Sequence, residues 1–276
     1  MPDLHPPRLA VERILKDTAE REILPRFLKV NGEMKADGSA FSAADIAAQE
    51  SLIRALARLA DLPMIGEEMP MKTQEAAWAQ GFAEGVWVMD PIDGSTNFLT
   101  GLPQFAVSVA LMRQGRPVLG VSYLPLMREM FSASLGGGVW LNGEKLPPIP
   151  ADAAHKAVAD TVACIDFKRL PPQLSLAIVH DAPIYSQRNF GSSVLDWCYL
   201  AAGRVDAITH GSERLWDYAA GWLMTEEMGG CVTTFETDDF AAASPWKRSI
   251  IAARDPELFR LWRDWLRQQM AEIRTR

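Results

Sequence analysis

The sequence predicts an α+β fold made of two lobes, an N-terminal lobe over residues 1–150 and a C-terminal lobe over residues 151–276. The chain has 276 residues, 48% of them hydrophobic, which is enough for one large domain or two coupled lobes with a sizeable core. The first lobe has the pattern of helices packed on an antiparallel sheet. In the second lobe short strands alternate with helices, which is typical of an α/β arrangement.

The N-terminal lobe opens with two predicted helices. Apolar side chains form a stripe over residues 8–29 that is broken around Pro25. A polar, glycine-containing loop is expected over residues 30–40. Ser42 then starts the second helix, where apolar residues recur at helical spacing. Both helices are expected to pack on the sheet that follows.

Apolar or alternating runs separated by short turns predict the strands of that sheet. The first strand ends in two glutamates, and the second, "VWVMD", ends in an aspartate. A hairpin with Asn142 and Gly143 at its tip completes the series. The predicted strands cover residues 62–68, 86–90, 105–112, 117–124 and 129–135, and the hairpin covers residues 136–146.

The C-terminal lobe is predicted from its alternation of short apolar runs and helical stretches. Two of the helices, over residues 192–203 and 215–230, end at glycine, the usual stop signal of a helix. A last helix is expected over residues 256–273. The predicted strands cover residues 161–165, 176–180, 205–209, 231–235 and 249–253.

Charge and cysteine usage exclude several classes of partner. The net charge of −7 and the pI of about 5.2 argue against nucleic acid and against adhesion to a membrane of anionic lipid. No apolar stretch approaches the roughly 20 residues of a spanning helix, and the first residues lack the apolar core of a signal peptide. Cys164, Cys198 and Cys231 are widely spaced and odd in number, which indicates reduced thiols in a cytoplasmic protein.

Acidic residues stand where the predicted strands end or the predicted helices begin. Side chains at such positions can be aimed into one cleft, since connections at the ends of elements are where sites are commonly built. The residues are Asp45, Glu67, Glu68, Asp90, Asp93 and Asp217.

If these side chains converge, their negative charges need a partner. Two carboxylates about 4 Å apart repel by roughly 4 kcal/mol at an effective dielectric constant of about 20. Several together stay ionised only if a cation joins them, and otherwise their pKa values rise. Hard oxygen ligands select Mg²⁺, with Mn²⁺ or Ca²⁺ as possible substitutes.

The stretch "VMDPIDGSTNF", residues 88–98, offers both a metal site and an anion site. Asp90 and Asp93 can hold two ions a few ångströms apart, with the backbone carbonyl of Ile92 as a further ligand. A pair of such ions suits in-line phosphoryl transfer. Gly94 and Ser95 present backbone N–H groups, and a helix that begins there would attract a phosphate.

Simpler structural interpretations exist for several of these acids. Asp45 stands three residues after Ser42, as in a capping box, and this role is compatible with catalysis. Asp217 also fits an acid favoured by the dipole at a helix N-terminus. Glu67 and Glu68 fit solvated loop positions equally well.

Four segments together resemble the inositol monophosphatase family of Mg²⁺-dependent, lithium-sensitive phosphatases. "DPIDGSTNF" and "LWDYAAG" resemble its two signatures, "MIGEE" its acidic strand end, and "KADGSAFSAAD" its first loop and helix start. The segments occur in the family's order, and the resemblance spans roughly residues 10–250. It implies a layered α/β/α/β/α sandwich of the sugar-phosphatase type and a homodimer.

The resemblance assigns the metal ligands by position. Glu67, Asp90 and the Ile92 carbonyl match the ligands of a first ion. Asp90, Asp93 and Asp217 match those of a second, and Glu67 would also serve a weaker third ion. The N-terminal lobe would thus carry the main metal site, and the C-terminal lobe would contribute Asp217.

The resemblance also assigns the catalytic and substrate-binding residues. Asp45 and Ser95 match the pair that orients the attacking water, with Glu67 as a further catalytic residue. Gly94 and Ser95 match the phosphate-binding turn, next to Asp93. The contacts to sugar or inositol hydroxyls are expected from Gly191, Ser192 and Ser193, in "FGSSV".

Two positions depart from the family pattern. Ser95 replaces the usual threonine and keeps the hydroxyl, with a looser rotamer. His210 stands where inositol-specific members carry a glutamate, and the nearest acid is Glu213. This departure concerns inositol specificity, not the phosphatase chemistry. His210 is either a substrate contact or a surface or loop-capping histidine.

The sequence therefore predicts a cytoplasmic, Mg²⁺-dependent phosphatase that hydrolyses a small phosphorylated polyol by metal-activated water attack. An inositol monophosphate is the leading substrate. Histidinol phosphate, a sugar bisphosphate and a 3′-phosphoadenosine nucleotide are the alternatives within the same superfamily. A regulatory binding protein that keeps the fold, and a metal-stabilised structural protein, are the alternatives outside enzymes.

Overall fold

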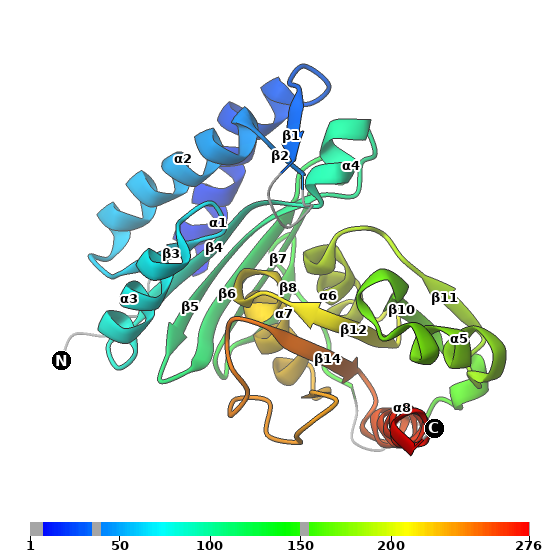
Figure 1. The fold of residues 1–276 in the computed structure, drawn as a ribbon. Coiled ribbons are helices and arrows are strands. Elements are labelled where there is room, and N and C mark those ends of the chain that lie inside the picture. Colours follow the sequence, from blue (N-terminus) through cyan, green and yellow to red (C-terminus); the bar gives the residue numbers. More distant parts are fainter. Residues whose placement is uncertain (1–7, 35–39, 150–154, 276) are drawn as a thin grey trace.

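The computed structural model of the chain shows five stacked layers, in the order helices, sheet, helices, sheet, helices (Figure 1). The structure describes residues 8–34, 40–149 and 155–275. The layers confirm the predicted α+β class and the sandwich that the family resemblance implies. The proposed lobe boundary at residues 150 and 151 falls outside the described residues and stays a prediction.

The first outer layer contains two helices, as predicted. Ser42 caps the second one, because its hydroxyl accepts a hydrogen bond from the backbone N–H of Ala44 at 3.1 Å. The helix predicted over residues 8–29 changes to a π turn and then to a 3₁₀ turn that contains Pro25, a residue with no N–H to continue an α-helix. The elements are α1 (Arg8–Thr18), η1 (Ala19–Ile23), η2 (Leu24–Arg26) and α2 (Ala43–Leu59).

The loop predicted over residues 30–40 is wrong at both ends, where the structure has an antiparallel strand pair. Strand β1 (Gly32–Met34) pairs with β2 (Ala40–Ser42), with Gly32 opposite Ser42. Each strand has only three residues, too few for a period-2 pattern to be read in the sequence. The residues between them, 35–39, lie outside the described part of the chain.

The first sheet has seven strands in the order β3-β4-β5-β6-β7-β8-β9. All neighbours are antiparallel except β3 and β4, and a parallel pair needs a crossover. Helix α3 (Met71–Gly81), which the sequence did not reveal, is that crossover. The strands are β3 (Met64–Gly66), β4 (Val86–Asp93), β5 (Ala106–Arg113), β6 (Arg116–Leu124), β7 (Glu129–Ser134), β8 (Gly138–Leu141) and β9 (Glu144–Lys145).

The middle layer consists of helices α6 (Ser193–Ala201) and α7 (Leu215–Glu227), and both confirm the predicted helices. Because sheets cover both of its faces, α7 is apolar around most of its circumference and is largely buried. The two helices pack closely at Gly221, where an added Cβ would lie 2.2 Å from the Cβ of Trp197. This layer carries C-terminal residues up to the first sheet.

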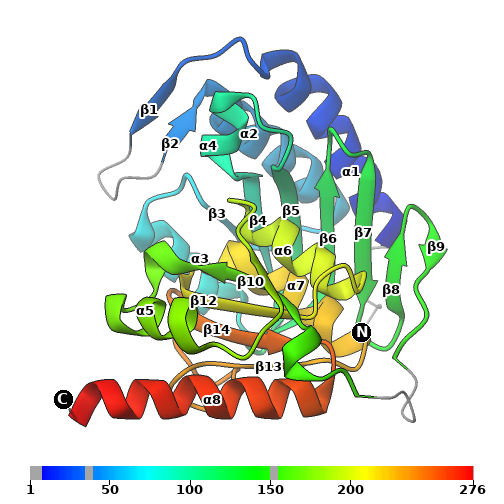
Figure 2. The ribbon, with the colours of Figure 1, turned by 90° about the vertical axis from the view of Figure 1, so that its right-hand side faces the viewer.

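The second sheet has the strand order β11-β10-β12-β14-β13, and helices α5 (Pro172–Asp181) and α8 (Pro256–Thr275) cover its outer face (Figure 2). Two short 3₁₀ turns, η3 (Val158–Asp160) and η4 (Phe167–Arg169), flank β10. The strands are β10 (Val162–Asp166), β11 (Ser186–Arg188), β12 (Ala207–Glu213), β13 (Cys231–Thr233) and β14 (Arg248–Ala253).

The strand predicted over residues 176–180 is wrong, since this stretch lies within α5. Leu174 and Ile178, four residues apart, are buried, whereas Leu176 and Val179 are 63% and 68% exposed. That is the period of a helix with one buried face. A short apolar run does not distinguish a strand from a helix, and the edge position in the sheet is taken by β11.

Three apolar cores fill the spaces between the five layers. Trp87 and Met89 of β4 face the core beneath α1 and α2, and Val86 and Val88 face the middle layer. The third core lies between the second sheet and helices α5 and α8. Trp87, Trp197 and Trp216 are buried aromatic side chains of these cores. Within the described ranges no helix is long and apolar enough to cross a membrane.

Candidate metal and phosphate site

Strand β4 delivers two carboxylates to one side of the first sheet. Residues three apart on a regular strand point to opposite faces, so Asp90 and Asp93 would normally be separated. The pairing with β5 shifts here: Asp90 lies opposite Ser108 and Asp93 opposite Ala106, so β4 contains one extra residue. This β-bulge turns the two aspartates toward a common space.

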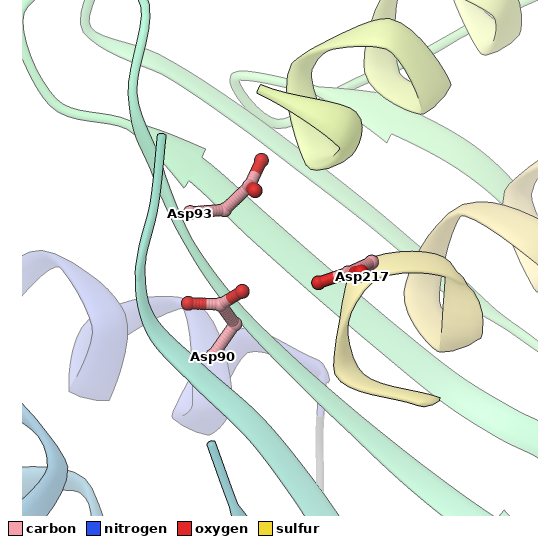
Figure 3. Close-up of side chains that lie close together, drawn as sticks. All are labelled: Asp90, Asp93 and Asp217. Atoms are coloured by element: carbon pink, nitrogen blue, oxygen red, sulfur yellow. The ribbon is translucent and has the colours of Figure 1, made fainter. Parts of the chain in front are cut away.

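Helix α7 brings a third carboxylate to the same place. Asp217 lies in its first turn, where the backbone N–H of Arg214 donates a hydrogen bond to its Oδ2 at 2.8 Å. One oxygen from each of Asp90, Asp93 and Asp217 lies within 4.8 Å of the others. We call these three residues the acid cluster; their carboxylates face the space between the end of β4 and the start of α7 (Figure 3).

The acid cluster strongly resists full ionisation. Burial raises the pKa of Asp90 well above its ordinary value, and the charges of Glu67, Asp93, Asp217 and Asp45 raise it further. Burial, followed by the charge of Asp93, raises the pKa of Asp217 from 3.8 to about 8. Neighbouring buried carboxylates with elevated pKa values are the electrostatic signature of a site whose positive charge comes from a bound cation.

The donor atoms fit a hard divalent cation. Oδ1 of Asp90 is buried and has no hydrogen-bond partner among the described residues, so it is available as a ligand. Glu67 follows β3, which runs beside β4, and its N–H donates to the Met89 carbonyl at 3.3 Å. Its charge acts on both Asp90 and Asp217. Carboxylate oxygens in this number select Mg²⁺, Mn²⁺ or Ca²⁺.

Asp45 and Ser95 form a hydrogen-bonded pair beside the acid cluster. Oγ of Ser95 lies 3.2 Å from Oδ1 of Asp45 and 2.9 Å from the Ile92 carbonyl oxygen. Oδ2 of Asp45 accepts from the backbone N–H of Ser42 at 2.7 Å, which completes the predicted capping box. The capping role and the position beside the site coexist, because each carboxylate oxygen serves one of them.

The predicted phosphate-binding turn lies directly after β4. Gly94 has a φ of 86°, and an added Cβ would lie 2.9 Å from the carbonyl oxygen of Gln104, so this position needs glycine. Helix α4 (Ser95–Thr100) begins at the next residue. The short helix on which the predicted anion site depended is therefore present.

The predicted contacts for substrate hydroxyls lie at the start of α6, next to Asp93. Ser192 caps this helix, and its hydroxyl donates a hydrogen bond of 2.5 Å to Oδ2 of Asp93. The backbone N–H of Val194 donates to the same oxygen at 2.7 Å. Gly191 and Ser193 flank Ser192. Oδ2 of Asp93 thus accepts both of these hydrogen bonds, which connect β4 to the start of α6.

His210 is not at the surface, which corrects that part of its predicted role, but its ring does accept a hydrogen bond from a nearby backbone N–H, as a capping histidine would. It lies on β12, between β10 and β14 in the second sheet, and is 4% exposed. Its Nδ1 accepts a hydrogen bond from the Ser212 N–H at 3.1 Å, and its Nε2 lies 3.0 Å from Oδ2 of Asp166. With Nδ1 as acceptor, Nε2 carries the ring hydrogen and donates a hydrogen bond to the Asp166 carboxylate.

Asp166 is a polar residue at this corner that the sequence did not reveal. It ends β10 in register with His210, and its Oδ1 accepts from the N–H of Lys168 at 3.0 Å. Burial opposes ionisation, but the hydrogen bonds that Asp166 receives from His210 and from the Lys168 N–H lower its pKa on balance. We call Asp166 and His210 the strand-end pair. The sequence signal that could have revealed Asp166 is its position as the last residue of the apolar run "VACID", at the end of a strand.

Glu213, the acid nearest the position of His210, points into the core. It is 1% exposed, and Nε1 of Trp197 donates a hydrogen bond to its Oε2 at 2.9 Å. Burial and the charge of Asp217 raise its pKa well above the ordinary value. Its carboxylate is therefore held within the core beside Trp197.

The fold and the acid cluster define a layered α+β protein with a group of carboxylates, at strand and helix ends, that could hold a metal ion. The sequence pattern of the inositol monophosphatase family matches residues 9–271. The chain therefore belongs to the inositol monophosphatase family, a family of phosphatases, and the resemblance found in its motifs is confirmed.

Individual relatives carry two kinds of name. The chain is 37% identical to the Nus factor SuhB of Escherichia coli K12 over 169 residues, which cover 59% of this chain and 62% of the relative. It is 34% identical to the inositol-1-monophosphatase of Caulobacter vibrioides over 206 residues, covering 71% and 76%. The match thus spans about three fifths of the length of SuhB-type relatives.

A solved structure extends the likeness to the whole fold. The crystal structure of the extragenic suppressor protein suhB from Bartonella henselae superposes with a TM-score of 0.80 at 28% identity. The superposition covers 94% of this chain and 97% of that protein. The five-layer arrangement is therefore shared along almost the full length of both proteins.

Proposed function

We propose that the chain is an Mg²⁺-dependent phosphatase of a small phosphorylated polyol, with an inositol monophosphate as the leading substrate. The observation that carries this proposal is the acid cluster joined to the Asp45–Ser95 pair at the end of one bulged strand. Such an arrangement is suited to hold cations beside a proton acceptor, which is what metal-assisted hydrolysis requires. The inositol-1-monophosphatase name of one relative supports the choice of substrate.

The residues of the acid cluster would hold the ions, with Glu67 and the Ile92 carbonyl as additional ligands. When bound, Mg²⁺ lowers the pKa of a coordinated water and neutralises charge on the phosphate. Ser95 would orient the attacking water and pass its proton to Oδ1 of Asp45, which faces the hydroxyl at 3.2 Å. No residue needs to form a covalent bond to phosphorus.

The leaving group would lie against the start of α6 and the strand-end pair. Both nitrogens of His210 are already engaged, so the acceptor offered at this corner is the Asp166 carboxylate. An ionised carboxylate accepts hydrogen bonds from hydroxyl groups. We therefore propose that Asp166 takes the part of the family glutamate and that His210 orients it.

A panel of phosphate esters, assayed with and without Mg²⁺, tests the function. The panel contains an inositol monophosphate, histidinol phosphate, fructose 1,6-bisphosphate, a 3′-phosphoadenosine nucleotide and 4-nitrophenyl phosphate. We expect Mg²⁺-dependent phosphate release with the highest kcat/KM for the inositol ester, and inhibition by Li⁺. If 4-nitrophenyl phosphate is hydrolysed as well as the inositol ester, the proposed specificity is wrong.

A regulatory role is the second candidate, because several relatives carry the name Nus factor. An Asp93→Asn variant separates the two roles. It removes a charged member of the acid cluster and keeps the shape of the side chain. A partner captured equally well by the parent and by this variant would show a binding role independent of hydrolysis.

The assembly and the location are also proposals. The family resemblance implies a homodimer, which analytical ultracentrifugation of the full chain tests directly. Sedimentation as a monomer at micromolar concentration would contradict it. The cytoplasmic location stays a prediction from cysteine usage and charge.

A further inference from the structure

Two connections that are far apart in the sequence meet next to the acid cluster. One is the turn from β4 into α4, residues 93–97. The other is the segment from Phe190 to Ser193 that leads into α6. Asp93 joins them at one point, through the hydrogen bonds from Ser192 and Val194.

Asn97 joins the same two connections at a second point. Its side chain is buried, with 7% exposure, and lies on the first turns of α4. The Nδ2 group donates to the Phe190 carbonyl at 2.7 Å and to the Gln104 carbonyl at 2.6 Å. Both partners are carbonyl oxygens, so the amide orientation is fixed and both N–H bonds are used.

The backbones at this junction approach as closely as glycine permits. An added Cβ on Gly191, whose φ is 74°, would lie 3.0 Å from Nδ2 and 3.1 Å from Oδ1 of Asn97. An added Cβ on Gly94 would lie 3.2 Å from the Gly191 carbonyl oxygen. The backbone at Phe190 and Gly191 is therefore held against the Asn97 amide, through the hydrogen bond to the Phe190 carbonyl and the close approach at Gly191.

We propose that Asn97 is a positioning residue that sets the Phe190–Ser193 segment against the phosphate turn and thereby determines binding of the polyol leaving group. The proposal rests on the proposed function, because it assigns the leaving group to this segment. Asn97 is not one of the proposed metal ligands, and it donates both of its amide hydrogens to backbone carbonyls. Its loss should alter leaving-group recognition and leave the metal-dependent step intact.

The test compares two substrates in the full-length protein. Asn97→Ala should raise KM for the inositol monophosphate by about tenfold, an effect of the size expected when the buried hydrogen bond to the Phe190 carbonyl no longer holds the segment in place. KM for 4-nitrophenyl phosphate, which has no hydroxyls for the segment to contact, should change by less than about twofold. kcat for both substrates and the Mg²⁺ concentration for half-maximal activity should stay within about twofold of the parent.

Thr100→Val is the matched control on the same helix. The Thr100 hydroxyl donates only within α4, with the Thr96 carbonyl at 2.8 Å as its nearer partner. This control should change KM for neither substrate. If it reproduces the Asn97→Ala effect, the effect comes from general loosening of α4 and the proposal fails.

Gly191→Ala approaches the same contact from the opposite side and covers the case in which Asn97→Ala does not fold. The new Cβ would press on the Asn97 amide, so KM for the inositol ester should rise here too. In the double variant the two increases should be less than multiplicative, since each change disturbs one shared contact. Independent, multiplicative effects would overturn the proposal.

The parent enzyme separates this inference from the proposed function. If the parent prefers another ester of the panel, the inositol assignment fails and the Asn97 comparison is made with that ester. Equal changes in KM for the preferred ester and for 4-nitrophenyl phosphate overturn the positioning role alone. If the parent hydrolyses no ester, both proposals fall.

Discussion

The acid cluster and the strand-end pair both place carboxylates at the ends of strands, yet their surroundings are opposite. Asp90 is buried among like charges, and its Oδ1 has no hydrogen-bond partner among the described residues. Asp166 receives hydrogen bonds from His210 and from the Lys168 N–H. The pKa of Asp90 is raised, and that of Asp166 is lowered.

This difference indicates what each carboxylate is for. Acids that the protein leaves without positive partners are suited to an external cation, because the cation supplies the missing charge. An acid that the protein keeps ionised and oriented is suited to accept hydrogen bonds from neutral groups. The first region would then perform the chemistry, and the second would select the leaving group.

The largest expected effect is on the acid cluster. Asp90→Asn should lower kcat/KM for every ester by roughly 10³-fold, because the variant would lose the carboxylate that we propose two ions share. In chelator the variant should melt at a higher temperature than the parent, since a buried carboxyl surrounded by like charges is removed. Phosphate release and thermal melting in EDTA measure the two effects.

Asp238→Asn is the control for this change. Asp238 is an exposed loop acid paired with Arg267, so its loss should alter neither activity nor the melting temperature in EDTA by a measurable amount. A lower melting temperature for Asp90→Asn in EDTA would contradict the contrast between the two regions.

Variants of Ser95 test whether proton transfer depends on the Ser95 hydroxyl, which lies beside the acid cluster. Ser95→Ala should lower kcat by roughly 10²-fold, because it removes the hydroxyl that contacts Asp45 and that we propose orients the attacking water. Ser95→Thr keeps that hydroxyl and should stay within about threefold of the parent. Steady-state kinetics with the preferred ester measure both. Similar losses in the two variants would mean that shape, not the hydroxyl, matters at this position.

Mg²⁺ binding should depend on pH through Asp217, whose pKa in the folded protein is about 8 against an ordinary 3.8. Below about pH 8 the cation must displace a proton, so its apparent affinity should fall about tenfold per pH unit for each proton displaced. Above that pH the affinity should level off. Activity titrations with Mg²⁺ between pH 6 and 9 measure this dependence.

The raised pKa of Asp217 also determines how the stability of the ion-free protein changes with pH. A carboxyl with a raised pKa stabilises the folded state below its ordinary pKa, and this contribution is lost as pH rises from about 4 to about 8. Melting temperatures in EDTA should therefore fall through this window, and Mg²⁺ should restore more stability at pH 8 than at pH 6. A constant Mg²⁺ effect across the window would contradict the prediction.

The smallest expected effect is at the strand-end pair. Asp166→Asn should raise KM for the polyol ester by about fivefold and leave 4-nitrophenyl phosphate hydrolysis unchanged, because only the leaving-group contact is weakened. Asp160→Asn, an exposed position before the other end of β10, is the control. Equal KM changes for both substrates would remove the distinction between the two regions.

The sequence predicted the acid cluster because each ligand lies beside a strong local signal. Asp90 and Asp93 follow an apolar strand and precede a glycine turn, and Asp217 lies in the first turn of a helix. What the sequence did not contain was the one-residue shift against β5 that turns both aspartates to the same side. Pairing register depends on the partner strand, not on the strand itself.

The strand-end pair and Asn97 were beyond prediction for a related reason. The contact between His210 and Asp166 exists because β10 and β12 pair in parallel at that register, 44 positions apart in the chain. Asn97 lies in the predicted phosphate-binding stretch, but its hydrogen-bond partner Phe190 is 93 positions away in the chain. No local pattern in the sequence indicates that contact. The error at residues 176–180 is of another kind, since a five-residue apolar run fits either period.

Helix α7 runs through the middle layer, carries Asp217 on its first turn and packs against β5 and β6, far from it in the sequence. A cation shared by Asp217 and the two aspartates of β4 would therefore act as a noncovalent cross-link between early and late parts of the polypeptide. Binding of this kind stabilises only the completed fold, in proportion to the free ion concentration. Cellular magnesium would then govern how well the protein resists proteolytic degradation, as well as how fast it works.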